Sequence, residues 1–286
     1  MLSTPCCWTG SPARRTDTVD ASDAQRRARG RPANLLANRS LERGIEILRA
    51  FRPGSEVLGN GELAERTGLA RSTVSRLTQS LVDTGFLQYD PALRAYRLGV
   101  PVLSLAHAMR SGSTVLQLAG PMMRELAQAG QLNVGLAMAD RDEMVYLESI
   151  RHGRKASLRS VVAGQRVPMA LTSLGRAWLA VAPEADYAAR MADLATRSTQ
   201  WPALRREIEA AVAHVRQHGW CAASWQPEVV AISAPLALEH YPVHVLNVSL
   251  STRASVAEVA AELAPRLMQL AAGIRHAVET AQSEPL

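Results

Sequence analysis

The stretch Leu63–Leu87, LAERTGLARSTVSRLTQSLVDTGFL, contains two short segments with helical apolar spacing that meet at Thr67 and Gly68. Gly68 can adopt the left-handed conformation that ends a helix. The second segment predicts a helix from about Ala70 to Thr84, whose inward side is formed by Ala70, Val74, Leu77, Thr78 and Leu81. Its opposite side is polar, with short side chains around one long basic residue, Arg76.

The residues around this helix complete a DNA-binding motif. SLERGIEILRAF predicts an earlier helix with Ser40 as its N-cap, and a short helix through ELAERT leads to Gly68. Strands at 86–89 and 95–98 predict the hairpin, or wing, of a winged helix-turn-helix. The alternative is a solvated amphipathic helix followed by an ordinary hairpin. The candidate DNA contacts are Arg71, Ser72, Thr73, Ser75, Arg76 and Gln79 on the helix, with Arg94 and Arg97 on the wing.

The composition is that of a folded protein with about two domains. The chain has 286 residues, 47% of them apolar, and no uninterrupted apolar run approaches the roughly 20 residues of a membrane span. The first residues show no basic segment followed by an apolar one, so we expect no secretory signal. Cys6, Cys7 and Cys221 are too few and too unevenly spaced for a disulfide framework, which favours a reducing, cytoplasmic location.

The net charge of +6 is concentrated near the N-terminus. Residues 1–39 hold seven Arg against three Asp, residues 40–110 hold nine Arg against seven acids, and residues 111–286 hold 16 of each sign. A basic N-terminal part suits a polyanion such as DNA. Within it, RGRP resembles an AT-hook core, so Arg29 and Arg31 are candidate minor-groove contacts of a disordered arm over residues 1–37. The alternative is a solvated tail attracted to phosphates without specificity.

The part of the chain after residue 113 has the pattern of an α+β domain. A helix over 114–129, with a kink or break at Pro121, precedes a predicted hairpin of strands 133–139 and 144–150. Helices are expected near 173–181, 184–194, 202–218 and 256–280, and strands near 220–224, 229–236 and 243–250. An antiparallel sheet flanked by helices follows from this order.

No catalytic motif stands out in this part. The chain has no Gly-x-Ser-x-Gly elbow, Walker loop or Gly-x-Gly-x-x-Gly fingerprint, so we expect no enzyme and no cofactor. His214, His218 and Cys221 have a spacing compatible with a metal site, because His residues four apart share a helix face. Gly219, which should end the helix before Cys221, argues against it. A metal-responsive regulator is the weaker alternative, and we predict no metal ligand.

Five segments, taken in order along the chain, resemble the IclR family of bacterial transcriptional regulators. They are SLERGIEILRAF, LAERTGLARSTVSRLTQSLVDTGFLQYDPALRAYRLG, GQRVPMALTSLGRAWLA, VRQHGW and AISAPL. The resemblance implies an α+β architecture with a winged helix-turn-helix over 38–99, a linker helix over 100–113, and a GAF-like effector-binding and oligomerisation domain over 114–286. In the linker, a stripe that could pair with another subunit, or else pack on its own domain, comprises Val102, Leu103, Leu105, Ala106 and Met109.

The same resemblance implies a small-molecule site above the sheet of the C-terminal domain. The expected lining residues are Gly135, Ala137, Gly164, Met169, Ser224, Ser233, Asn247 and Ser249. Arg159 and Arg166 border that region and could pair with a ligand carboxylate, although ordinary surface ion pairs are the alternative. In many relatives the corresponding segment carries a run of acidic residues and a Gly before the Ala-Pro strand. Here it reads WCAASWQPEVVAISAP, in which Glu228 is the only acidic residue.

Taken together, the sequence predicts a cytoplasmic one-component regulator, dimeric or tetrameric, that binds a palindromic operator in double-stranded DNA. A small organic effector of the carboxylic-acid class is expected to modulate DNA binding or activation. A winged helix used for protein contact is the remaining alternative.

Overall fold

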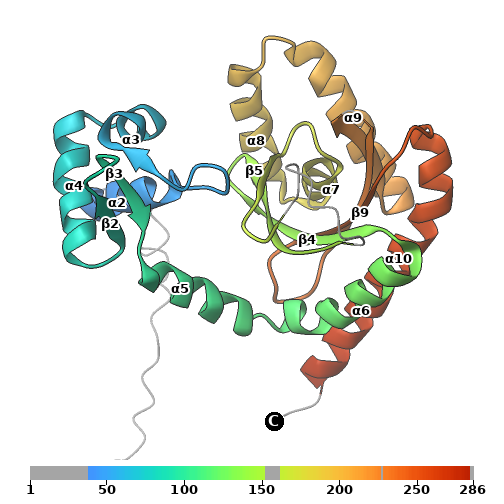
Figure 1. The fold of residues 1–286 in the computed structure, drawn as a ribbon. Helices are drawn as coiled ribbons and strands as arrows, with labels where there is room; N and C mark the ends of the chain where they lie inside the picture. The colour runs from blue at the N-terminus through green and yellow to red at the C-terminus, as the bar shows by residue number, and fades with distance from the viewer. Residues whose placement is uncertain (1–37, 152–161, 227, 284–286) are drawn as a thin grey trace, which may run out of the picture.

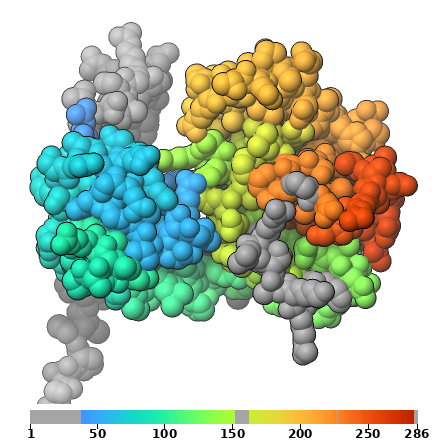
Figure 2. Space-filling model, turned by 45° about the horizontal axis from the view of Figure 1, so that its top comes forward, coloured from blue at the N-terminus to red at the C-terminus, as the bar shows by residue number. Residues whose placement is uncertain are grey.

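The computed structural model describes residues 38–151, 162–226 and 228–283. Figure 1 shows two lobes joined along one side by two helices, and the two lobes are also distinct in the space-filling view of Figure 2. The first lobe is the winged helix-turn-helix and the second is a helix-flanked antiparallel sheet. The predicted α+β fold class is therefore confirmed.

The first lobe combines a helical core with a small sheet, whose strand order is β1-β3-β2. Its elements are α2 (Arg39–Arg49), β1 (Leu58–Gly59), α3 (Asn60–Thr67), α4 (Arg71–Asp83), β2 (Leu87–Asp90) and β3 (Ala95–Leu98). The buried apolar side chains of α2, α3, α4 and β2 form one cluster. β1 was not predicted, because its two residues are too few to show an alternating pattern.

The sequence predicted the N-cap of α2 incorrectly and the residue that ends α3 correctly. Asn38, rather than the predicted Ser40, is the N-cap of α2, and its Oδ1 accepts hydrogen bonds from the N–H groups of Ser40 and Leu41 at 3.1 and 3.2 Å. Asn and Ser cap helices about equally well, so residue type alone did not separate the two positions. Gly68 follows α3 with φ of 67°, the left-handed conformation expected of it.

The two lobes are connected by α5 (Val100–Ser111) and α6 (Thr114–Gly130). No residue of α5 is buried, and Leu103 is 71% exposed. α6 packs on β4 and α10 and continues through Pro121, so of the predicted kink or break the break is absent. Among the described residues, no helix combines the length and the apolar character needed to cross a bilayer.

The second lobe is built on a sheet with the strand order β6-β5-β4-β9-β8-β7, in which all neighbours are antiparallel. Its further elements are β4 (Asn133–Asp140), β5 (Glu143–Ile150), β6 (Arg166–Pro168), α7 (Ser173–Val181), α8 (Glu184–Arg197), α9 (Trp201–His218), β7 (Cys221–Gln226), β8 (Val229–Leu236), β9 (His244–Ser251) and α10 (Val256–Ser283). The elements expected from the sequence are present with small shifts of their ends, and β6 is additional.

Helices cover both faces of this sheet, as Figure 1 shows. α6 and α10 pack on one face, where alternate residues of β4 such as Val134 and Leu136 are buried. α7 packs on the other face with α9 beside it, and Ala137 of β4 is buried there. Because successive side chains of a strand point to opposite faces, Gly135 shares the α7 side with Ala137.

Candidate DNA interface and effector site

α4 turns a polar face to solvent and an apolar one to the core. Val74, Leu77 and Thr78 are buried, and the Thr78 hydroxyl donates to the backbone oxygen of Val74 at 3.0 Å. Tyr96 of β3 lies within hydrogen-bond distance of the same hydroxyl, at 3.3 Å, which ties α4 to the wing. On the opposite side, the predicted DNA contacts are exposed except for the half-buried Thr73; the exposed ones are Arg71, Ser72, Ser75, Arg76 and Gln79.

Two guanidinium groups on this face are free to bind something outside the chain. The side chains of Arg71 and Arg76 form no hydrogen bond or ion pair with any residue that the structure describes. Gln79 differs, because its Nε2 donates to Asp83 Oδ1 at 2.8 Å. Unpaired arginines on an exposed helix can contact phosphates or the base edges of a major groove.

The wing positions two further arginines beside α4. Asp90 shapes its tip, because Asp90 Oδ1 accepts the backbone N–H groups of Ala92 and Leu93. The Leu93 hydrogen bond is the main reason that the pKa of Asp90 is lowered. Arg94 sits at the tip with φ of 48° and is exposed, whereas Arg97 Nη2 lies 3.4 Å from Asp90 Oδ2. The other predicted DNA contacts, Arg29 and Arg31, lie outside the described residues.

In the second lobe, four of the strands bring small and polar residues into one lateral row. The register pairs Cys221 with Ser233, Ser233 with Asn247, and Asn247 with Gly135. We call these four residues the central row; it lies on the face of the sheet that α7 covers. A Cβ atom added at Gly135 would lie 2.3 Å from Asn247 Oδ1 and 2.5 Å from Tyr146 Cε1, so a larger residue does not fit.

The central row carries a buried polar atom without a hydrogen-bond partner. Asn247 Oδ1 is buried and accepts no hydrogen bond from the residues that the structure describes. The hydroxyls of Ser233 and Ser173 lie 2.8 Å apart, and Cys221 Sγ donates to the backbone oxygen of Ser173 at 3.4 Å. Burial raises the pKa of Tyr146, and its hydrogen bond with Asn247 offsets this only in part. Tyr146 is therefore an uncharged phenol at neutral pH.

The other predicted lining residues surround this row at different depths. Ala137 and Met169 are fully buried, Ser249 is half-buried on β9, and Gly164 and Ser224 are exposed. Gly164 is tied to the row through its N–H, which donates to the backbone oxygen of Tyr146 at 2.8 Å.

Two residues beside the row, Tyr146 and Ser173, were not predicted. Tyr146 pairs with Ala137 across β4 and β5, at a register shift that the sequence pattern does not reveal. Of the two arginines expected near this region, Arg166 pairs with Asp140 and Glu143, and Arg159 lies outside the described residues.

His214, His218 and Cys221 do not form a metal site. The two imidazole rings lie tilted by 43° with centroids 4.4 Å apart, while Cys221 is buried and its Sγ donates to the backbone oxygen of Ser173. Burial raises the pKa of the Cys221 thiol to about 12, which disfavours the thiolate that a metal needs. In the part of the chain that the structure describes, no group of three His, Cys, Asp or Glu residues could hold a metal ion.

Two family models match this chain, one on each lobe. The IclR helix-turn-helix domain matches residues 40–91, and the C-terminal domain of the bacterial transcriptional regulator IclR matches residues 107–276. The chain belongs to the IclR family. It is therefore a helix-turn-helix transcriptional regulator and not an enzyme, as the sequence predicted.

Individual relatives agree with this assignment. The chain is 37% identical over 183 residues to the HTH-type transcriptional regulator TsaQ1/TsaQ2 of Comamonas testosteroni, covering 63% of this chain and 66% of that protein, just under two thirds. An IclR-family regulator structure from Brucella abortus has 33% identity and a TM-score of 0.76, covering 83% of this chain and 91% of that one. An IclR homologue of Microbacterium hydrocarbonoxydans, solved with 4-hydroxybenzoate, has 23% identity and a TM-score of 0.62, covering 84% and 99%. At that identity the last likeness shows the fold alone.

Proposed function

We propose that this protein is a cytoplasmic one-component regulator that reads a palindromic operator through α4 and binds a small organic acid at the central row. The observation that carries the proposal is the pairing of two features in one chain. One is an exposed helix face with unpaired arginines, and the other is a buried polar atom without a partner in a separate domain. Ligand binding would alter DNA binding by favouring one arrangement of the paired DNA-reading domains.

The DNA-reading part of the proposal rests on α4 and the wing. Helix-turn-helix proteins place the N-terminal residues of the second helix against base edges, and Arg71 and Arg76 occupy the first two turns of α4. Arg94 on the wing is positioned for a phosphate or for the adjacent minor groove. Because guanine accepts two hydrogen bonds from one guanidinium, Arg76 is the residue we assign to base reading.

The proposal includes at least a homodimer, because a palindromic operator needs two readers held about 34–36 Å apart. α5 supports this part. Its apolar side chains remain uncovered within one chain, with Val100 68%, Leu103 71% and Met109 55% exposed. Pairing of α5 with a second copy would bury this surface and fix the two winged helices relative to each other.

The proposed effector is a carboxylic acid that also carries a hydroxyl group. Asn247 Oδ1 lacks a donor, and a buried acceptor left unpaired costs about 1–3 kcal/mol, so a ligand hydroxyl that donates to it would bind favourably. Ser173, whose hydroxyl meets Ser233, is the first residue of α7, and the positive end of that helix favours a carboxylate. The 4-hydroxybenzoate bound to the Microbacterium homologue has both groups.

We expect Asn247→Leu to weaken effector binding about 10- to 100-fold, because it removes the unpaired acceptor at similar volume. Stability should fall by about 1–3 kcal/mol, because the buried Tyr146 hydroxyl loses its hydrogen bond with Asn247. Calorimetric titration of a panel of hydroxylated and unhydroxylated aromatic acids, beginning with 4-hydroxybenzoate and benzoate, measures this directly. Ser251→Ala, at the exposed end of the same strand, is the matched control and should bind as the wild type does. Equal affinity of wild type and Asn247→Leu for every acid that binds would refute the assignment of the site.

A further inference from the structure

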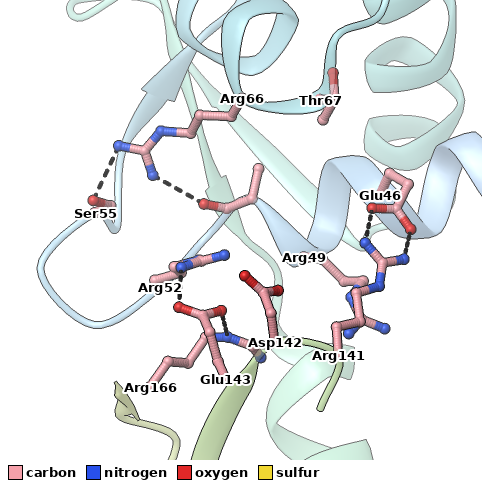
Figure 3. A pocket seen from close by; sticks show the side chains of 11 residues that line it. Glu46, Arg49, Arg52, Ser55, Arg66, Thr67, Arg141, Asp142, Glu143 and Arg166 are labelled. Carbon is pink, nitrogen blue, oxygen red and sulfur yellow. Dashed lines mark hydrogen bonds and ion pairs between the residues drawn. The ribbon is translucent and has the colours of Figure 1, made fainter. Parts of the chain in front are cut away.

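Charged side chains of α2 and of the β4–β5 turn bring the two lobes of one chain into contact. The last turn of α2 and the residues after it face the turn between β4 and β5, as Figure 3 shows. Arg141 Nη1 donates to Glu46 Oε2 at 2.7 Å, and Arg52 Nη1 donates to Glu143 Oε1 at 2.8 Å. Arg49 pairs with Asp140 beside them. A cavity of about 480 Å³ lies between the same residues.

This contact is ionic and not apolar. The buried apolar side chains that the structure describes fall into clusters that each stay within one lobe. The linker helix α5 adds no buried residue of its own, and it meets the effector domain through Arg110, which donates to Glu148 Oε2 at 2.7 Å and to the backbone oxygen of Leu147. The orientation of the winged helix on the effector domain therefore depends on charge pairs that are partly exposed, with side-chain exposures of 51% for Arg141 and 33% for Glu46. An exposed pair biases an equilibrium by a factor of at most about five, so such a contact opens easily.

One more arginine connects this contact to the candidate effector region. Arg166 Nε donates to Glu143 Oε2 at 2.7 Å and Arg166 Nη2 donates to Asp140 Oδ2 at 2.5 Å, so it shares both carboxylates with the winged helix. Its side chain is only 17% exposed. Arg166 begins β6, two residues after Gly164, whose N–H is bonded to Tyr146 beside the central row. Asp140 and Glu143 are thus contacted both by this segment, through Arg166, and by Arg49 and Arg52.

Two carboxylates of this contact, those of Glu46 and Asp140, are held in their charged form. The hydrogen bond from Arg141 is the main cause that lowers the pKa of Glu46. Burial alone would raise the pKa of Asp140, but hydrogen bonds from Arg166 and Arg49 outweigh it and the pKa is lowered. The ion pairs of Glu46 and Asp140 therefore persist throughout the neutral range, and ionic strength rather than pH weakens them.

We propose that these charges form an interdomain latch: they hold the winged helix against the effector domain, and Arg166 transmits the state of the effector site to it. The latch comprises Glu46, Arg49, Arg52, Asp140, Arg141 and Glu143. The regulatory role of the latch rests on the proposed function, because binding of an effector is the event that would displace Arg166. The docking of the two lobes through these charges is a claim of its own, and it can be tested without DNA or effector.

The latch is tested by reversing the charge of Glu46, then that of Arg141, and then both together. The readout is hydrogen–deuterium exchange of the full chain. Glu46→Arg should speed exchange in residues 138–146 about three- to tenfold, and Arg141→Glu should do the same in residues 46–57. Each substitution is read in the opposite lobe, where a purely local disturbance has no effect. The double variant restores an opposite-charge pair and should return both segments close to wild-type exchange.

The control is Arg205→Glu, which breaks the exposed Arg205–Glu209 pair inside α9 and should leave both segments unchanged. Unchanged exchange in the opposite lobe of both single variants, or no recovery in the double variant, overturns the latch. With operator DNA and an acid that binds, latch variants should still bind each of them, and the effect of the acid on DNA affinity should fall at least about threefold. If the single variants speed exchange as expected but the acid still changes DNA affinity as much as in the wild type, the docking of the lobes stands and the regulatory role of the latch is overturned.

Discussion

Replacing Gly175 by alanine is expected to destabilise the effector domain by at least about 3 kcal/mol. Gly175 lies in the first turn of α7, and an added Cβ atom would stand 2.1 Å from the backbone oxygen of Met169 and 2.4 Å from its Cα. Both are backbone atoms, so no side-chain rotation relieves the clash. The helix would have to move off the segment that runs from Arg166 to Met169, which joins the latch to the candidate effector site.

Thermal unfolding followed by calorimetry measures the effect, with Gly44→Ala as the control of opposite sign. Gly44 is also helical, but no atom lies within 4 Å of an added Cβ, so alanine there should stabilise α2 by about 0.5–1 kcal/mol. A Gly175→Ala variant that unfolds at the wild-type temperature would show that α7 does not pack on the Met169 backbone as described.

Truncating Leu63 should unfold the DNA-binding lobe while sparing the other. Leu63 is fully buried in the cluster formed by α2, α3, α4 and β2, and replacing such a leucine by alanine costs about 2–5 kcal/mol. A domain of roughly 60 residues has only about 3–9 kcal/mol of stability in total. We expect Leu63→Ala to lose operator binding at physiological temperature and to show an unfolding transition of the winged helix well below that of the wild type.

The transition of the effector domain should remain in place, because no described apolar cluster spans both lobes. Glu65→Ala, an exposed position on the same helix, should change stability by no more than about 0.5 kcal/mol. If Leu63→Ala instead lowers a single transition shared by both lobes, the two domains fold as one unit and the ionic latch is not their main contact.

The sequence predicted well those helices and strands whose apolar residues follow a local pattern, and α4 is the clearest case. Its inward and outward residues were assigned from helical spacing, and the observed burial of Val74, Leu77 and Thr78 follows that assignment. Ala70 was also assigned to the inward side but is exposed, because it is the N-cap that precedes α4. The wing and the strands of the effector domain were also predicted, because alternation and turn residues are local signals. The family resemblance supplied the association of these elements into two domains.

What the sequence could not show depends on contacts between distant residues. Arg166 was expected either to bind a ligand or to form a surface ion pair, and only the fold brings it to Asp140 and Glu143. The pairing of α2 with the β4–β5 turn joins residues more than 90 positions apart, for which no local pattern exists. The unpaired oxygen of Asn247 likewise appears only once its neighbours across the sheet are known.

The most direct test of the whole account is the affinity of the full chain for its own upstream DNA, measured by fluorescence anisotropy with Arg76→Ala and Arg43→Ala in parallel. Arg43 is exposed on α2 and is not part of α4, so it serves as the charge-matched control. We predict sequence-selective binding that Arg76→Ala weakens by about 1–3 kcal/mol, or roughly 5- to 150-fold, and that Arg43→Ala leaves nearly unchanged. If the upstream region lacks an operator, a pool of fragments from the same genome supplies one. Binding that is equally strong on unrelated DNA and unaffected by Arg76→Ala would contradict the assignment of α4 as the reader.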